Sequence, residues 1–133
     1  MDKDRIDDNE ILYRVVKKSF PDHFINGAPT AALFMDEGGA SVDRDGGRTE
    51  EAIVNKFKKR FKRQDDYLTS VKISAQDCRN IETYPNPCNN TKNIFHAEIH
   101  DTPDVKLISL YKAIQLALRC ELVPDCVEMS NAV

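Results

Sequence analysis

The sequence predicts a single α+β domain, with a small mixed or antiparallel sheet of about four or five strands and two main helices. Two periodicities support this prediction. Apolar and polar residues alternate over residues 67–73 and 93–100, as they do in half-buried strands. Apolar positions recur instead at helical spacing over residues 49–63, and residues 103–122 are apolar around more than half of a helical circumference. A chain of 133 residues fits one core.

The domain boundaries follow from charge and from proline. Residues 1–9 are rich in charge and contain one Ile, so we expect a flexible acidic leader there. Pro124 stops the last predicted helix, which leaves residues 124–133 as a C-terminal tail. The single domain is therefore expected over residues 10–123.

Two further strands are predicted in the first half of the chain. Residues 11–16 are apolar and rich in β-forming side chains. Residues 40–43 predict a brief strand between the pairs Gly38-Gly39 and Gly46-Gly47. Such glycine pairs favour tight turns or an open loop around Ser41.

Helix ends are indicated by capping residues and by proline. Thr49 is suited to cap the first main helix, and Ser74 to cap a short helical turn. Pro103 after Asp101 and Thr102 predicts the start of the second main helix. Residues 84–90 contain two prolines and three asparagines, which predict an irregular loop.

Composition excludes several classes of protein. The 19 basic and 22 acidic residues give a net charge of −3, so no overall attraction to nucleic acid or to anionic lipid is expected. No apolar run has the length of a membrane span, and the N-terminus lacks the apolar stretch of a signal peptide. We therefore expect a cytoplasmic protein without membrane contact, whose cysteines are reduced. They are Cys78, Cys88, Cys120 and Cys126.

The most suggestive local pattern lies in the predicted strand over residues 93–100. A period of two places His96, Glu98 and His100 on one face, with alternate Cβ atoms about 7 Å apart. Such a set can bind a divalent metal, or one imidazole can transfer a proton. A solvated or hydrogen-bonded polar face is the favoured interpretation, so neither a metal nor a cofactor is predicted. Cys88 is the best-placed cysteine nucleophile, although a structural thiol is favoured there.

Several short segments together resemble a loose group of small uncharacterised bacterial proteins. They are LYR at residues 12–14, SVD at 41–43 and HAEI at 96–99, and the resemblance spans roughly residues 11–118. It implies kinship and not an activity. The matching polar positions are Arg14, Ser41, Asp43, Arg79 and His96.

These positions suggest a site for an anionic or phosphate-bearing ligand. Arginines bind such groups as forks, a serine donates a hydrogen bond, and a histidine transfers a proton. The candidate catalytic residues are His96, Arg14 and Ser41, and the candidate ligand-binding residues are Arg79, Asp43, Lys58 and Lys59. The competing interpretation is structural: a buried Arg–Asp pair and a hydrogen-bonded histidine join the loop to the sheet.

Three functions remain open at this stage. The first is a small enzyme or ligand-binding domain, and whether it is an enzyme is undecided. The second is a non-catalytic accessory subunit that binds another protein. The third is nucleic-acid contact through residues 56–63, which hold six cations, although cations are also favoured at the end of a helix. The oligomeric state is not predicted.

Overall fold

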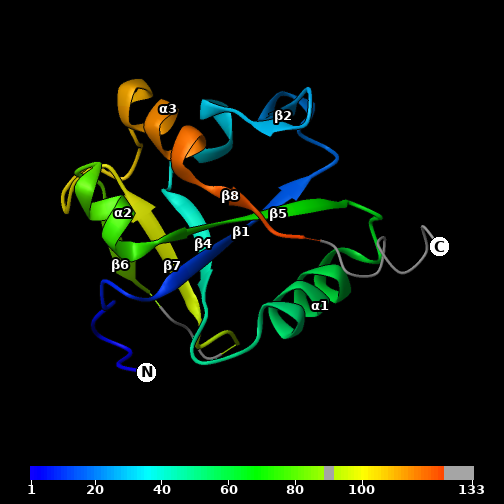
Figure 1. Ribbon diagram of the computed structural model, residues 1–133, viewed down its shortest axis with the longest axis horizontal. Helices are drawn as coiled ribbons and strands as arrows, with labels where there is room; N and C mark the ends of the chain where they lie inside the picture. The colour runs from blue at the N-terminus through cyan, green and yellow to red at the C-terminus, as the bar shows by residue number, and fades with distance from the viewer. Residues whose placement is uncertain (89–91, 125–133) are drawn as a thin grey trace.

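The computed structural model describes residues 1–88 and 92–124 and contains a six-stranded sheet (Figure 1). The strand order is β6-β7-β4-β1-β5-β8, and every neighbouring pair is antiparallel. The strands are β1 (Ile11–Lys17), β4 (Ala40–Arg44), β5 (Tyr67–Ser74), β6 (Tyr84–Pro87), β7 (His96–His100) and β8 (Glu121–Leu122). The α+β class is thus confirmed, with a larger sheet than expected.

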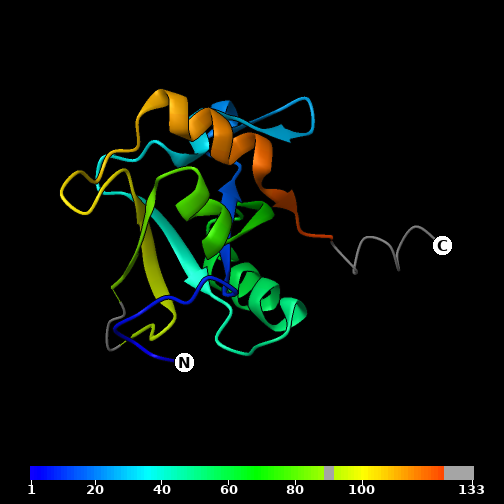
Figure 2. The same ribbon diagram turned by 60° about the vertical axis from the view of Figure 1, so that its left-hand side comes forward.

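Helices cover both faces of this sheet. They are α1 (Glu50–Phe61), α2 (Ala75–Asn80) and α3 (Leu110–Arg119). Two 3₁₀ turns, η1 (Pro21–His23) and η2 (Ala31–Phe34), flank a small hairpin of β2 (Phe24–Ile25) and β3 (Ala28–Pro29). Figure 2 shows α3 on one side of the sheet and α1 on the other. None of the helices in the described residues has both the length and the hydrophobicity to cross a membrane.

The two faces of β1 enter two separate hydrophobic clusters. Leu12 and Val16 pack into the larger cluster, which includes residues of α2, α3 and η2. Tyr13 packs into a smaller cluster with Ile53 and Phe57 of α1. A strand buried on both faces is continuously apolar. This explains why residues 11–16 lack the alternation seen in residues 67–73.

The capping predictions are confirmed for the first two helices. The Thr49 hydroxyl accepts a hydrogen bond from the Ala52 N–H at 3.2 Å. The Ser74 hydroxyl accepts one from the Asp77 N–H at 3.0 Å. Each cap satisfies a donor that has no partner within the helix.

The prediction that residues 84–90 form an irregular loop is wrong for its first half, which is β6. This strand lies at the edge of the sheet, with β7 as its neighbour. Proline is tolerated in an edge strand because only one side of such a strand pairs with a neighbour. Residues 89–91 of the predicted loop lie outside the described residues.

The second main helix begins later than predicted. Thr102 Oγ1 accepts hydrogen bonds from the N–H groups of Asp104 and Val105, which closes a turn around Pro103. An Asp101 carboxylate oxygen accepts the Ser109 N–H at 3.0 Å. These local bonds stabilise a loop, so α3 begins only at Leu110. It also ends earlier than predicted, at Arg119, because the last residues of the predicted helix form β8, and Pro124 therefore does not end the helix.

The acidic N-terminal segment is attached to the sheet at several points. Ile6 is buried within the larger hydrophobic cluster. Arg44, which is fully buried, pairs with Glu10 at 2.7 Å and donates to the Arg5 carbonyl. The predicted tail lies outside the described residues except for Pro124.

Candidate functional site

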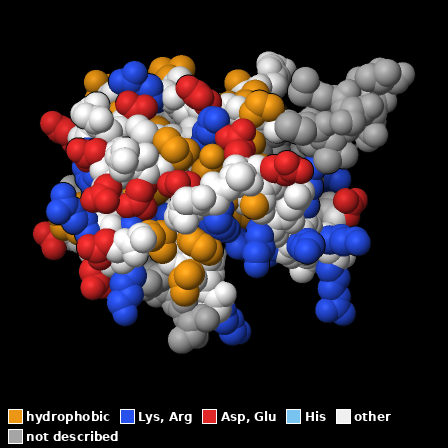
Figure 3. Space-filling view, turned by 60° about the horizontal axis from the view of Figure 1, so that its bottom comes forward, with side chains coloured by type: hydrophobic (Ala, Val, Ile, Leu, Met, Phe, Trp, Pro, Cys, Tyr) orange, Lys and Arg blue, Asp and Glu red, His pale blue; other side chains and the backbone are white. Residues whose placement is uncertain are grey.

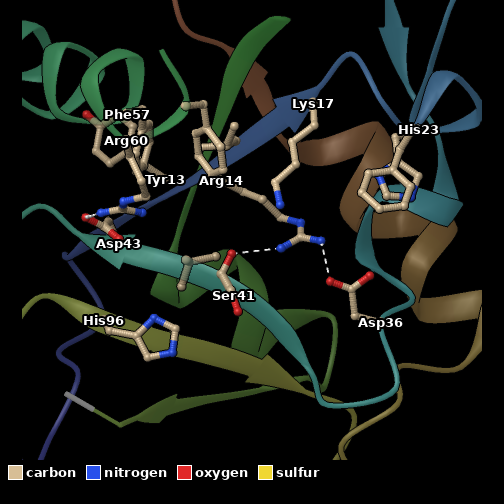
Figure 4. Close-up of a pocket in the computed structure, with 14 residues that line it drawn as sticks. Tyr13, Arg14, Lys17, His23, Asp36, Ser41, Asp43, Phe57, Arg60 and His96 are labelled. Carbon is tan, nitrogen blue, oxygen red and sulfur yellow. Dashed lines mark hydrogen bonds and ion pairs between the residues drawn. The ribbon is translucent and has the colours of Figure 1, made fainter. Parts of the chain in front are cut away.

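A cavity of about 480 Å³ lies between α1 and the face of the sheet formed by β1, β4 and β7 (Figure 4). We call it the α1 cavity. Its lining brings together four of the polar residues expected from the sequence: Arg14, Ser41, Asp43 and His96. The prediction gave no spatial arrangement for these residues, which come from three different strands.

Arg14 acts in this cavity as a structural link. The guanidinium is buried and donates hydrogen bonds to the Leu33 carbonyl, the Ser41 carbonyl and the Asp36 carboxylate, each at 2.8 Å. Burial lowers the pKa of Arg14, and Asp36 opposes that shift. These bonds join β1 to η2 and to β4 beyond Tyr13, where the recorded pairing of the two strands ends. The positive charge of the Arg14 guanidinium is therefore largely compensated within the protein.

Asp43 is also held by partners on several segments. One carboxylate oxygen accepts a hydrogen bond from the Asn93 side chain at 3.2 Å. The other lies 3.6 Å from a guanidinium nitrogen of Arg48 and 3.6 Å from one of Arg60. The buried carboxylate thus links β4 to α1 and to the segment before β7.

Ser41 and His96 lie on the same face of two paired strands. In the register, Ser41 is opposite Glu98 and His96 is opposite Asp43. Among the described residues, no hydrogen bond joins the Ser41 hydroxyl to an imidazole. A nucleophilic serine needs such a base within hydrogen-bonding reach.

Further residues of the α1 cavity were missing from the sequence-based site. Lys17 Nζ lies 4.9 Å from the centroid of the Phe61 ring and 5.9 Å from that of Phe20. His23 stacks on Phe20 with ring centroids 4.8 Å apart, and burial lowers the pKa of His23. Arg60 reaches the cavity from α1. Lys17 shares a face of β1 with Tyr13, whereas the predicted site residue Arg14 lies on the other face, so the period of two gave no signal for Lys17.

The other predicted ligand-binding residues lie elsewhere. Arg79 on α2 pairs with Asp8 at 2.6 Å and donates to the Ile6 carbonyl, so it holds the N-terminal segment. Lys58 lies with its ammonium 5.9 Å from the Tyr67 ring centroid. Lys59 lines a second depression on the other side of Arg60.

This second depression, the basic groove, has a volume of about 540 Å³ and is lined by five cationic side chains and one carboxylate, that of Asp43. The cations are Arg48, Lys56, Lys59, Arg60 and Lys92. The Arg48 guanidinium also stacks 3.6 Å from the centroid of the Phe95 ring. In Figure 3, several Lys and Arg side chains lie close together at the lower right, and others are spread over the rest of this face. Arg60 and Asp43 line both depressions.

The polar face of β7 has a more specific geometry than the sequence suggested. Glu98 Oε1 is 2.8 Å from His100 Nε2, and Glu98 Oε2 is 3.8 Å from His96 Nε2. His100 is buried, whereas the other two side chains are each 24% exposed. The donor atoms of Cys88, His96 and Glu98 all lie within 4.8 Å of one another. Burial, together with the charge of Glu98, raises the pKa of Cys88 to about 11.

Comparisons of this chain with protein-family models, with curated proteins and with solved structures found no match.

Proposed function

We propose that this domain binds a small anionic ligand, one with a phosphate or carboxylate group and a planar apolar part, in the α1 cavity. The observation that carries the proposal is the placement of Lys17. Its ammonium group contacts two aromatic rings, and it forms no ion pair with a described carboxylate.

The charges around the cavity support an anion. Of the cations that line it, Arg14 is paired with Asp36, and Arg60 shares Asp43 with Arg48. Lys17 is thus left as a positive charge without a fixed counterion among the described residues. A ligand anion next to Lys17 gains a charge-assisted hydrogen bond in a partly desolvated setting.

The remaining walls suit an apolar group. Phe20, Phe57 and Phe61 line the cavity, and the stacked ring of His23 extends this surface. A volume of about 480 Å³ lies within the range of small-molecule sites, about 300–1,000 Å³. Aromatic walls provide stacking, and the polar groups orient the ligand.

Isothermal titration calorimetry with a panel of anions tests this proposal. The panel contains inorganic phosphate, an aromatic carboxylate and a nucleoside monophosphate. We expect Lys17→Gln to weaken the best ligand about 10- to 100-fold, because it removes a charge-assisted hydrogen bond. Lys18→Gln is the matched control, since Lys18 pairs with Asp65 at the surface. If no member of the panel binds, or if both variants bind equally, the proposal is wrong.

A second candidate function is self-association through α3. Helix α3 and the residue that precedes it by one turn expose a row of large apolar side chains, which we call the α3 stripe. Its members are Leu107, Leu110, Tyr111, Ile114 and Leu118. Tyr111 is 74% exposed and Leu118 81% exposed, while Ala113 and Leu116 on the opposite side are buried. A contiguous exposed apolar surface is typical of a protein interface.

The partner that best fits the α3 stripe is a second copy of this chain. Its members recur at intervals of three and four residues, the spacing of a seam between two helices. A twofold axis brings identical surfaces together, so a charged residue at the axis opposes its own copy. The α3 stripe contains no charged residue and avoids that cost.

Light scattering after size-exclusion chromatography tests self-association. We expect the wild-type chain to form a dimer and Leu118→Glu to be monomeric, and the two should have the same melting temperature at concentrations where the wild type is also monomeric. Leu68→Glu is the matched control, because Leu68 is an exposed leucine on β5. A wild-type chain that stays monomeric at high concentration contradicts this function and leaves the α1 cavity proposal intact.

A further inference from the structure

The pairing of β6 with β7 places a cysteine beside the polar face of β7. Pro87 of β6 is paired with Ala97 in an antiparallel ladder. Continuing that register by one residue puts Cys88 opposite His96. Because side chains alternate between faces, Cys88, His96 and Glu98 all emerge on the face opposite to Ala97.

The donor atoms of these three residues are close to the spacing of a metal site. All lie within 4.8 Å of one another, and His96 Nε2 is 3.8 Å from Glu98 Oε2. In a tetrahedral zinc site the donors lie about 2.0–2.3 Å from the metal, which places them roughly 3.3–3.8 Å apart. Small rotations of half-buried side chains are enough to close the remaining gap.

The combination of donors selects the metal. A thiolate, an imidazole and a carboxylate together suit zinc, whereas magnesium and calcium prefer oxygen ligands alone. Three protein ligands leave one position of a tetrahedron for water or for another molecule. We propose that Cys88, His96 and Glu98 bind one zinc ion with an open fourth position.

His100 positions Glu98 within this site. Its Nε2 lies 2.8 Å from Glu98 Oε1, and this contact turns the other carboxylate oxygen towards His96. The ring of His100 packs directly against Gly39, where an added Cβ would lie 2.6 Å from His100 Cδ2. Partners of this kind orient a ligand without touching the metal.

This inference does not depend on the proposed anion site, although His96 also lines the α1 cavity. Zinc binding needs no other ligand and can be measured directly. On binding, the Cys88 thiol loses its proton to solvent and the sulfur bonds to zinc. The ion would place an additional positive charge beside the cavity, on the side of β4 away from Lys17.

Metal titration of the full chain, first stripped with a chelator, tests the site. We expect one equivalent of Zn²⁺ to bind and to raise the melting temperature. Co²⁺ in its place should show an intense absorption band from charge transfer between thiolate and cobalt. Cys88→Ser should abolish that band, and His96→Asn and Glu98→Gln should each weaken zinc binding about 100-fold or more. Cys120→Ser is the matched control and should bind metal as the wild type does.

His100→Asn separates positioning from ligation. We expect zinc affinity to fall about 10- to 100-fold while the cobalt–thiolate band persists, because the three ligands remain. The site is wrong if the wild type binds no stoichiometric zinc, or if the band survives in Cys88→Ser. If Cys88→Ser does not fold, unchanged zinc affinity in folded His96→Asn is an equally decisive contradiction.

Discussion

The two faces of the sheet differ in how much of their surface a helix covers. The face towards α3 holds the larger hydrophobic cluster, and α2, α3 and η2 contribute to it. On the other face, α1 packs near β1 and β5, and the strands β4, β7 and β6 extend beyond it. These strands carry Ser41, Asp43 and His96, which line the α1 cavity, and the rest of the polar face of β7. Because α1 covers only part of this face of the sheet, polar side chains from several strands can lie next to one another there.

The two faces also differ in what stabilises them. On the α1 side, the buried Asp43 carboxylate is fixed by three polar partners. Arg14 reaches the α1 cavity from the other face of β1, which it shares with Leu12 and Val16. On the α3 side, apolar burial dominates, and the outer surface of the helix is apolar as well. Variants on the first face should therefore act through unpaired polar groups, and variants on the second through lost packing.

Arg14→Met should have the largest effect on stability. It removes three hydrogen-bond donors and leaves the Leu33 and Ser41 carbonyls without their partner in a buried setting. The Asp36 carboxylate that remains is 47% exposed, so most of the loss comes from the two carbonyls, at about 1–3 kcal/mol for each. Urea denaturation measures the change in the free energy of unfolding. A loss below about 1 kcal/mol would mean that Arg14 is not a structural link.

Substitutions on the two sides of α3 should differ in their effect on the free energy of unfolding. Leu116 is fully buried, so Leu116→Ala should cost about 2–4 kcal/mol in the free energy of unfolding. Leu118→Ala on the α3 stripe should cost less than about 0.5 kcal/mol, measured below the concentration at which the chain associates. Equal losses in the two variants would indicate that the α3 stripe is covered within the single chain.

The basic groove should bind nucleic acid with an affinity that depends on salt concentration, and the α3 side should not. We expect weak binding of single-stranded DNA that decreases steeply as salt concentration rises. Lys56→Gln with Lys59→Gln should lower the slope of log affinity against log salt by up to about 2, one for each lost phosphate contact. Lys58→Gln is the control, because Lys58 lies against Tyr67. Fluorescence anisotropy measures the slope, and equal slopes in all variants contradict nucleic-acid contact.

The local part of the fold could be predicted from the sequence. The cap at Thr49, the cap at Ser74 and the helical period of α1 depend on residues within a few positions of one another. The start of α3 could not be predicted, because the bonds from Asp101 and Thr102 compete with a helix that Pro103 would otherwise begin. The strand β6 was missed because tolerance of proline depends on a position at the sheet edge.

In the candidate site too, features that depend on nearby residues could be predicted, and features that depend on distant residues could not. Alternation along β7 predicted that His96 and Glu98 share a face, which follows from strand geometry alone. The proximity of Cys88 depends on the pairing of β6 with β7, and the separation of Arg79 from the α1 cavity depends on its bonds to the N-terminal segment. Such long-range partners leave no local pattern. Lys17 was missed for another reason, because it lies on the face of β1 opposite to that of the predicted Arg14.

The smallest predicted effect is a pH dependence on the α1 side. Burial lowers the pKa of His23 below its ordinary value of 6.5, and the charges of Arg14 and Lys17 add to this effect. Asp22 and Asp36 oppose it. The folded state therefore disfavours the protonated imidazole, so this contribution to stability is fully present above pH 6.5 and is lost as pH falls through the folded pKa.

We expect His23→Asn to reduce the difference in urea midpoint between about pH 7.5 and about pH 5. At the higher pH the urea midpoints of the variant and the wild type should differ only because the variant lacks the stacking of His23 on Phe20. All three histidines lie in the α1 cavity or on the polar face of β7, so the α3 side contributes no imidazole to this titration. If the pH dependence is the same in both proteins, the environment of His23 favours neither protonation state.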